Sequence, residues 1–210
     1  MAAAGWCADD APSEAETLLF LTDHLKNVVP AAKLLYGFRR AGSLAAGFDD
    51  TIELRVRAEG GAKQVSVAFF TGQRQIAYPD MTHAEGNPVL LYFLERDILE
   101  MERLTGGSSL YFQKMIRLAL AHSARVAKTK LSYNGRDVAA TEITIAPYVD
   151  DPHRSQIGKY ASKTYVFTLS GEVPGGVYSV RTFVPSASGA VNDVPLLEER
   201  VNFVRIAKGT

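Results

Sequence analysis

The residues of this chain whose types best suit catalysis or metal binding lie in one loop. Asp150, Asp151 and His153 fall close together between Pro147 and Gln156. Two carboxylates beside an imidazole can hold a metal ion or act as acid and base. Loops favour the same residue types in solvated turns, however. The loop therefore supports two interpretations, an enzyme site and an ordinary polar turn.

A glycine-rich turn is the second candidate site. Thr105-Gly-Gly-Ser-Ser109 precedes a predicted helix, and backbone N–H groups at a helix start can bind an anion. The Walker A and Gly-x-Ser-x-Gly patterns are absent. A helix stop followed by a helix cap explains the same residues. No histidine pair has the spacing of a helical zinc site, so we expect no catalytic residue, no metal ion and no cofactor.

Aromatic residues at alternate positions of predicted strands form the third candidate. They could line a concave apolar cavity for a lipid-like ligand, together with one side chain from each of two predicted helices. They could equally be a packed core, because strands favour aromatics for packing alone. The residues expected at the cavity are Tyr36, Phe38, Phe69, Leu94, Phe112, Tyr165, Phe167 and Tyr178.

Two helices in the middle of the chain must position Leu94 and Phe112. Asn87 is a good N-cap, Pro88 suits a first helical turn, and Gly106-Gly107 provides a stop. The second helix is expected over residues 110–125. In the first helix the apolar stripe is Leu90, Leu94, Ile98 and Met101, and the side expected to face solvent is Glu95, Arg96, Glu100 and Arg103.

Strands are predicted on both sides of the helices. Thr51–Arg57 has the clearest alternation of apolar and charged residues. Asn134-Gly135 is typical of a type I′ hairpin turn, and 173–176 of a type II turn. The strands are expected at 33–40, 51–57, 63–71, 74–78, 130–133, 136–139, 142–146, 159–170, 177–184 and 198–206. The pattern predicts an α+β fold, a strongly curved antiparallel half-barrel of about nine strands with a helical hairpin over one face.

Composition limits the possible partners. The 23 basic and 23 acidic residues balance, so nothing in the net charge favours nucleic acid. No apolar run is long enough to predict a transmembrane segment. Cys7 is the only cysteine, which excludes an intramolecular disulfide. Residues 1–16 are expected to be a flexible N-terminus or the remnant of a secretory signal, and residues 17–210 a single domain, periplasmic or secreted.

Several segments resemble an uncharacterised family of exported proteobacterial proteins. They are 86–97, 103–107, 111–112, 116–120, Phe48-Asp49-Asp50, 147–152 and 173–178. The resemblance covers nearly the whole chain after residue 17 and implies export, but it implies no activity. The strand–helix–helix–strand order also resembles, at the level of fold, the lipoprotein-localisation factors. Those are periplasmic half-barrels whose apolar concave face is covered by helices and receives acyl chains.

Three functions follow as hypotheses. The first is a non-enzymatic periplasmic binding or carrier protein for a hydrophobic, lipid-like ligand, with the helices as a lid. The second is a structural or interaction protein of the cell envelope with a filled core, which would bind its partner at an edge strand or an apolar patch. The third is an enzyme that uses the 150–153 loop, whose side chains should then converge with Arg or Ser on a pocket.

Overall fold

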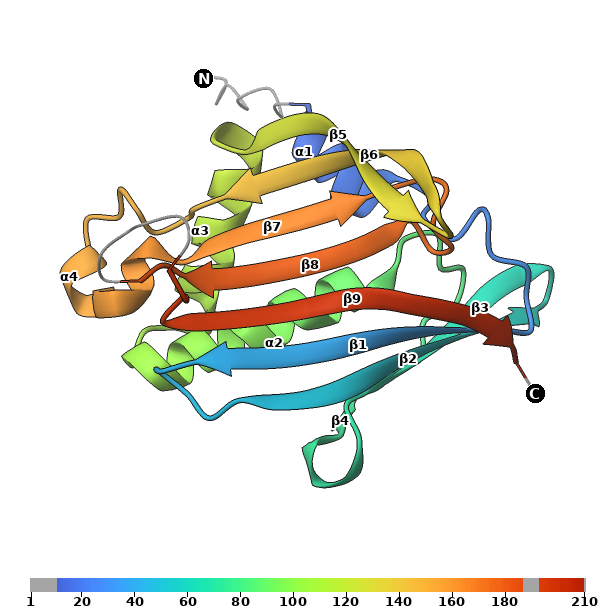
Figure 1. Ribbon diagram of the computed structural model, residues 1–210, viewed down its shortest axis with the longest axis horizontal. Coiled ribbons are helices and arrows are strands. Elements are labelled where there is room, and N and C mark those ends of the chain that lie inside the picture. Colours follow the sequence, from blue (N-terminus) through green and yellow to red (C-terminus); the bar gives the residue numbers. More distant parts are fainter. Residues whose placement is uncertain (1–10, 187–192, 210) are drawn as a thin grey trace, which may run out of the picture.

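One antiparallel sheet of nine strands forms the body of the protein, with strand order β4-β3-β2-β1-β9-β8-β7-β6-β5 (Figure 1). The computed structural model describes residues 11–186 and 193–209. The strands are β1 (Ala32–Gly42), β2 (Phe48–Glu59), β3 (Ala62–Phe69), β4 (Ile76–Ala77), β5 (Arg125–Tyr133), β6 (Arg136–Ile145), β7 (Thr164–Leu169), β8 (Val177–Val184) and β9 (Leu197–Lys208). The α+β class and the curved antiparallel sheet are confirmed.

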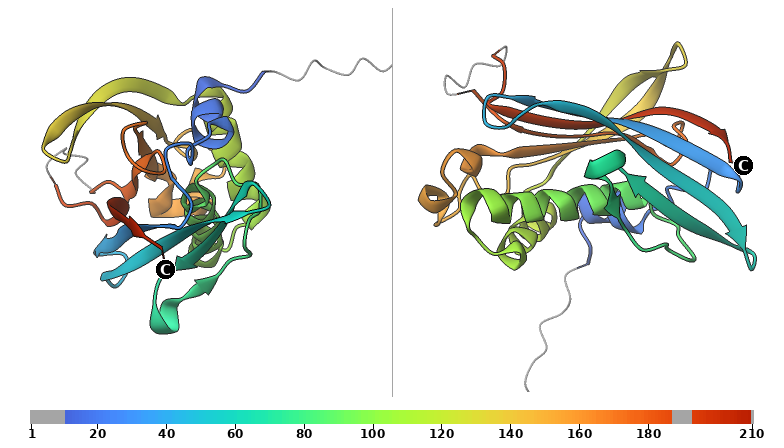
Figure 2. Two further views of the ribbon diagram at one scale, coloured as in Figure 1. Left: turned by 90° about the vertical axis from the view of Figure 1, so that its right-hand side faces the viewer. Right: turned by 90° about the horizontal axis from the view of Figure 1, so that it is seen from below.

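Two helices, α2 (Pro88–Thr105) and α3 (Ser109–His122), cover one face of the sheet (Figure 2). They connect β4 at one edge to β5 at the other, so the chain must cross the whole sheet between these strands. Shorter helical pieces are α1 (Glu14–Glu16), a π turn (Thr17–Leu21), α4 (Arg154–Ile157) and 3₁₀ turns at Gly72–Arg74 and Gly158–Ser162. No helix in the described ranges is long and apolar enough to cross a membrane.

The first and last strands pair at the centre of the sheet. β1 and β9 are antiparallel neighbours along their whole length, with a bulge between Leu35 and Tyr36. The chain therefore runs from the centre to one edge, crosses under the sheet as α2 and α3, and returns from the other edge to the centre. This order makes Arg40 and Glu199, which are 159 positions apart, direct neighbours.

Several boundaries differ from the sequence prediction. The second helix ends at His122, and β5 starts at Arg125 as a long partner of β6, which is one strand rather than two. β7 starts only at Thr164, because a 3₁₀ turn occupies the residues before it. The type I′ turn is confirmed by the positive φ angles of Asn134 (51°) and Gly135 (74°).

The end of the predicted flexible terminus has a defined structure. Ser13 and Glu16 form a capping box that starts α1. The Ser13 hydroxyl also donates to the carbonyl of Leu120 on α3 at 2.9 Å, and Ala15 is buried. These contacts fix residues 13–16 against the helical layer. The possible signal remnant at residues 1–10 lies outside the described residues.

Asn87 joins three parts of the fold at the start of α2. Its side-chain oxygen accepts from the Val89 N–H at 3.1 Å, which caps the helix as predicted. Its amide nitrogen donates to the Tyr36 hydroxyl on β1 and to the Gly175 carbonyl, both at 2.8 Å. Gly175 has φ 79° and lies in the turn between β7 and β8. Asn87 is only 3% exposed, so none of these groups can exchange its partner for water.

We expect Asn87→Ala to lower the free energy of unfolding by about 2–4 kcal/mol, because it removes a helix cap and leaves two buried polar groups unpaired. Urea denaturation followed by circular dichroism measures this. Ser108→Ala is the matched control, since Ser108 is the N-cap of α3 and makes no capping bond through its side chain. Equal stability losses in the two variants would contradict the role of Asn87 in linking α2 to β1 and to the turn between β7 and β8.

Candidate functional site

The eight residues predicted to line an apolar cavity lie in or against the core. Seven are buried, and Tyr178 is half-buried and packs on the same cluster. Phe38 packs edge-on against Phe70 with ring centroids 4.6 Å apart, and Tyr36 packs against Phe203 at 5.6 Å. The structure thus brings the predicted set together beneath α2 and α3. Its role in ligand binding stays a prediction.

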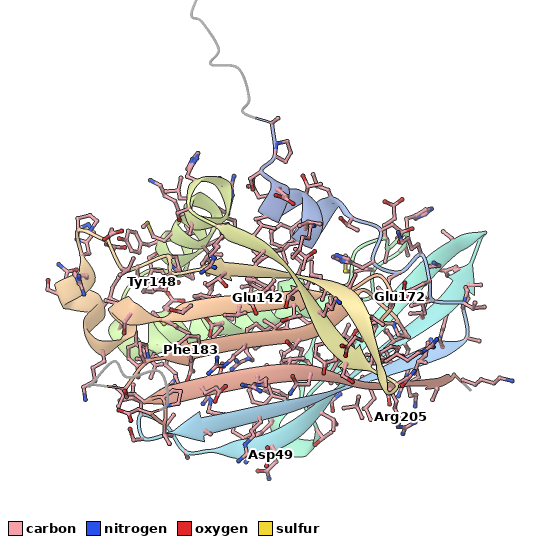
Figure 3. The ribbon with its side chains drawn as sticks, turned by 45° about the horizontal axis from the view of Figure 1, so that its top comes forward. Asp49, Glu142, Tyr148, Glu172, Phe183 and Arg205 are labelled. Carbon is pink, nitrogen blue, oxygen red and sulfur yellow. The ribbon has the colours of Figure 1, made fainter. Side chains whose placement is uncertain are left out.

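A charged cluster that sequence reasoning missed is buried among these aromatics. Asp97 of α2 is 0% exposed, and Lys163, just before β7, is 1% exposed. The Lys163 ammonium donates to one Asp97 carboxylate oxygen at 2.5 Å, and the Tyr165 hydroxyl donates to the other at 2.7 Å. The Tyr148 hydroxyl lies 3.3 Å from that of Tyr165. Tyr148 itself lies at the α4 end of the sheet (Figure 3).

A second group of charges links α2 to the two central strands. The guanidinium of Arg96 and that of Arg40 on β1 both bind the Glu199 carboxylate on β9, Arg40 at 2.5 Å. Arg40 also forms an ion pair with Glu100 at 3.3 Å, and Glu100 forms one with Arg103 at 2.9 Å. Arg40 and Glu199 meet because they lie directly opposite one another on the neighbouring strands β1 and β9.

The position of Arg96 corrects the sequence analysis, which placed it on the solvent side of the helix. Arg96 is buried and lies over the rings of Phe38 at 5.2 Å and Phe93 at 5.5 Å. Stacking of this kind stabilises a buried cation, and the Nε atom of Arg96 has no hydrogen-bond partner among the described residues. The break in the apolar run at Glu95-Arg96-Asp97 was the only signal in the sequence.

The two charged groups shift the ionisation of their members. Burial raises the pKa of Glu199, but attraction by Arg96, Lys163 and Arg40 outweighs it and lowers the pKa to about 2. Burial, reinforced by the charge of Asp97, raises the pKa of Tyr165 well above its usual value. Glu199 is therefore a permanent anion and Tyr165 a permanent hydrogen-bond donor at neutral pH. Together they hold α2 on the sheet.

In the 150–153 loop, which was a candidate enzyme site, the Asp151 carboxylate forms hydrogen bonds to neighbouring residues of the protein. The Asp151 carboxylate is buried and accepts from the Tyr111 hydroxyl at 2.6 Å and from the His153 backbone N–H at 2.7 Å. Burial, and then the hydrogen bond to Asp151, raise the pKa of Tyr111 to about 12. Asp150 is exposed. In the described part of the chain, no three His, Cys, Asp or Glu side chains gather into a metal site.

The glycine-rich turn meets this loop. Gly106 has φ 72° and ends α2, and the Thr105 hydroxyl donates to the Met101 carbonyl at 2.7 Å. The turn is thus a helix stop followed by a helix start, which is the simpler of the two sequence interpretations. A hollow of about 310 Å³ separates it from α4, lined by Thr105–Ser108, Tyr111, Phe112, His153, Gln156 and Ile157.

A larger groove of about 580 Å³ runs between α2, α3 and the π turn. Most of its lining is apolar. Three leucines at its surface are unusually exposed for large apolar side chains: Leu91 (45%), Leu99 (54%) and Leu110 (75%). The other lining residues are Glu16, Phe20, Leu94, Glu95, Ile98, Ser109, Gln113, Ile116, Arg117 and Leu120. Leu94 is thus the one member of the predicted set that faces this groove.

The sequence held a partial signal for this groove. Leu91 lies beside the apolar stripe of α2, and Leu99 lies further round the helix, beyond Glu95, so that apolar residues reach well past the stripe. A helix that is apolar over a wide arc needs more than one neighbour. The sheet covers part of this arc, and the groove is the part that α3 and the π turn leave open.

Comparisons with known proteins concern the fold. No protein-family model matches the chain, and no curated protein matches it. Among solved structures, the lipoprotein LppX of Mycobacterium tuberculosis is 10% identical, covers 82% of this chain and 84% of its own, and gives a TM-score of 0.33. A LolA superfamily protein, NE2245 from Nitrosomonas europaea, is 12% identical over 93% of each chain with a TM-score of 0.24.

Proposed function

We propose that this protein is a non-enzymatic binding or carrier protein for a hydrophobic, lipid-like ligand, held in the groove of α2, α3 and the π turn. The observation that carries the proposal is the groove itself. Its volume of about 580 Å³ lies in the range of roughly 300–1,000 Å³ typical of small-molecule sites. Its lining has the composition of such a site, mostly aliphatic side chains with a few polar groups.

The exposed leucines supply the driving force. Each apolar side chain that leaves water contributes about 25 cal/mol per Å² of buried area. Leu91, Leu99 and Leu110 keep about half or more of their surface in contact with water. A ligand that covers them gains this energy without unpacking the core. We place this function in the periplasm or outside the cell, as the resemblance to exported proteins implies.

The predicted aromatic set offers a second position for the ligand, between the helices and the sheet. Access there would require α2 to leave the sheet and to break the Lys163–Asp97 and Arg96–Glu199 ion pairs. The groove needs no such opening. We therefore assign the ligand to the groove. The next experiment distinguishes this position from the interior one.

Tryptophan quenching by a brominated lipid tests the assignment. Trp6 is the only tryptophan, so Trp6→Phe gives a silent background. Added to it, Leu110→Trp reports the groove, Tyr178→Trp the interior and Val204→Trp an exposed site on β9. A neutral dibrominated monoacylglycerol should quench the Leu110→Trp signal alone. Quenching only at Tyr178→Trp would move the site to the interior. No quenching in any variant, either by this lipid or by charged lipids with the same acyl chain, would refute the proposal.

Substitution of two groove leucines should weaken binding. Leu99→Gln with Leu110→Gln removes about 2 kcal/mol of apolar contact, about thirtyfold in Kd. Isothermal titration with the same monoacylglycerol measures the loss. Leu21→Gln is the matched control, because Leu21 is an exposed leucine (62%) near the groove that does not line it. An equal loss of affinity in the control would mean that the contacts are not specific to the groove.

A further inference from the structure

A second hollow adjoins the groove at one end. It has a volume of about 740 Å³ and is lined by residues 11, 13 and 16 at the N-terminal side and by Lys114, Arg117, Leu118, Ala121 and His122 of α3. Glu16 and Arg117 line both hollows. The apolar groove and this second hollow therefore border one another at these two side chains, and together they form the depression considered below.

The second hollow differs from the groove in its charge. Lys114, Arg117 and His122 face a single acid, Glu16, whose carboxylate already accepts the Ser13 backbone N–H at 2.9 Å. Lys114 and Arg117 are exposed, and neither forms an ion pair with any residue in the ranges 11–186 and 193–209. The other acid of the groove, Glu95, lies on α2 and does not line the second hollow. Lys114, Arg117 and His122 thus form a basic end of the depression. Because the chain has no net charge, this positive charge is a local feature.

The spacing on α3 orders the two regions along one line. Leu110, Gln113 and Arg117 line the groove at intervals of three and four residues, which places them on one face of the helix. At 1.5 Å per residue, Leu110 lies about 10 Å from Arg117 along the axis. An extended acyl chain that covers Leu110 and Leu99 can thus reach the basic end with its polar terminus.

We infer that the ligand is an anionic amphiphile with a single acyl chain, whose carboxylate or phosphate head group binds Lys114, Arg117 and His122. This inference rests on the proposed groove and adds the chemistry of its ligand. Arg117 has the central role, since its guanidinium can donate two parallel hydrogen bonds to a carboxylate or a phosphate. The charge of the basic end and the shape of the depression together select an amphiphile over a wholly apolar molecule.

The test compares three dibrominated lipids with the same acyl chain in the Trp6→Phe, Leu110→Trp protein: a monoacylglycerol, a fatty acid and a lysophosphatidic acid. We expect at least one anionic lipid to bind about tenfold more tightly than the neutral one, and its identity separates a carboxylate from a phosphate head group. Raising the salt concentration should reduce this ratio. Lys114→Gln with Arg117→Gln should bring the ratio close to one, whereas Lys130→Gln on β5 should preserve it.

Two results would overturn the inference. Equal affinity for neutral and anionic lipids would show that the basic end does not recognise a head group. An unchanged ratio in the Lys114→Gln, Arg117→Gln protein would show that any preference arises elsewhere. Both results require that the lipids bind, so they differ from a failure of the proposed function, in which none of the three lipids quenches Leu110→Trp.

Discussion

Asp97→Ala is expected to lower the free energy of unfolding by about 3–5 kcal/mol, the largest effect of any single substitution proposed for this chain. The substitution leaves the Lys163 ammonium buried without its ion-pair partner, and removing one partner of a buried ion pair costs this much. The Tyr165 hydroxyl loses its acceptor in the same step. Urea denaturation of the wild type and the variant measures the difference.

A double substitution separates the cost of the unpaired charge from the value of the pair. Replacing Asp97 with Leu and Lys163 with Met removes both charges and keeps the volume apolar. Its stability should lie much closer to that of the wild type, because a buried pair is often worth little relative to apolar residues. Glu53→Ala is the surface control, as it breaks the half-exposed pair with Lys33 and should cost at most about 1 kcal/mol. A loss of that size for Asp97→Ala would contradict the buried-pair interpretation.

The sequence predicts the local elements well because their signals are local. Asn87, Pro88 and Gly106 mark the ends of α2, and Asn134-Gly135 marks the hairpin. The pairing of β1 with β9 leaves no such signal, since it depends on which long connection brings two strands together. The burial of Arg96 was missed for the same reason. Its counter-ion Glu199 lies 103 residues away, and without that partner a charged residue is assigned to the surface.

The candidate site likewise combines features that a local sequence pattern predicts with features that depend on how distant elements pack. The alternating aromatics are buried together, as the strand period predicts. The groove depends on the packing of Leu91, Leu99 and Leu110 from two helices near a π turn, and no single-element pattern contains that arrangement. The basic end of the depression likewise requires that α1 and α3 lie side by side, which the Ser13–Leu120 hydrogen bond establishes.

Glu199→Gln should remove a large part of the acid sensitivity of this protein. The folded-state pKa of Glu199 lies at about 2, below its ordinary value of 4.5. In this direction the unfolded state binds the proton more tightly, so the stabilisation is present above pH 4.5 and is lost as the pH falls towards 2. A shift of this size corresponds to about 3 kcal/mol. At pH 7 the variant should be less stable than the wild type, and the difference should shrink as the pH approaches 2.

Denaturation in urea at a series of pH values from 7 to 2 measures this convergence. Glu198→Gln is the matched control, because Glu198 is the preceding residue of β9 and pairs with Arg181 and Arg200 in a far more exposed position. Screening by solvent should make its effect small at every pH. If the Glu199→Gln protein instead lost stability in parallel with the wild type, the ion pairs would contribute nothing that depends on pH. The contacts of Asp97 with Lys163 and Tyr165, together with apolar packing, would then hold α2 to the sheet, and the interior aromatics would be easier to reach than the Glu199 ion pairs imply.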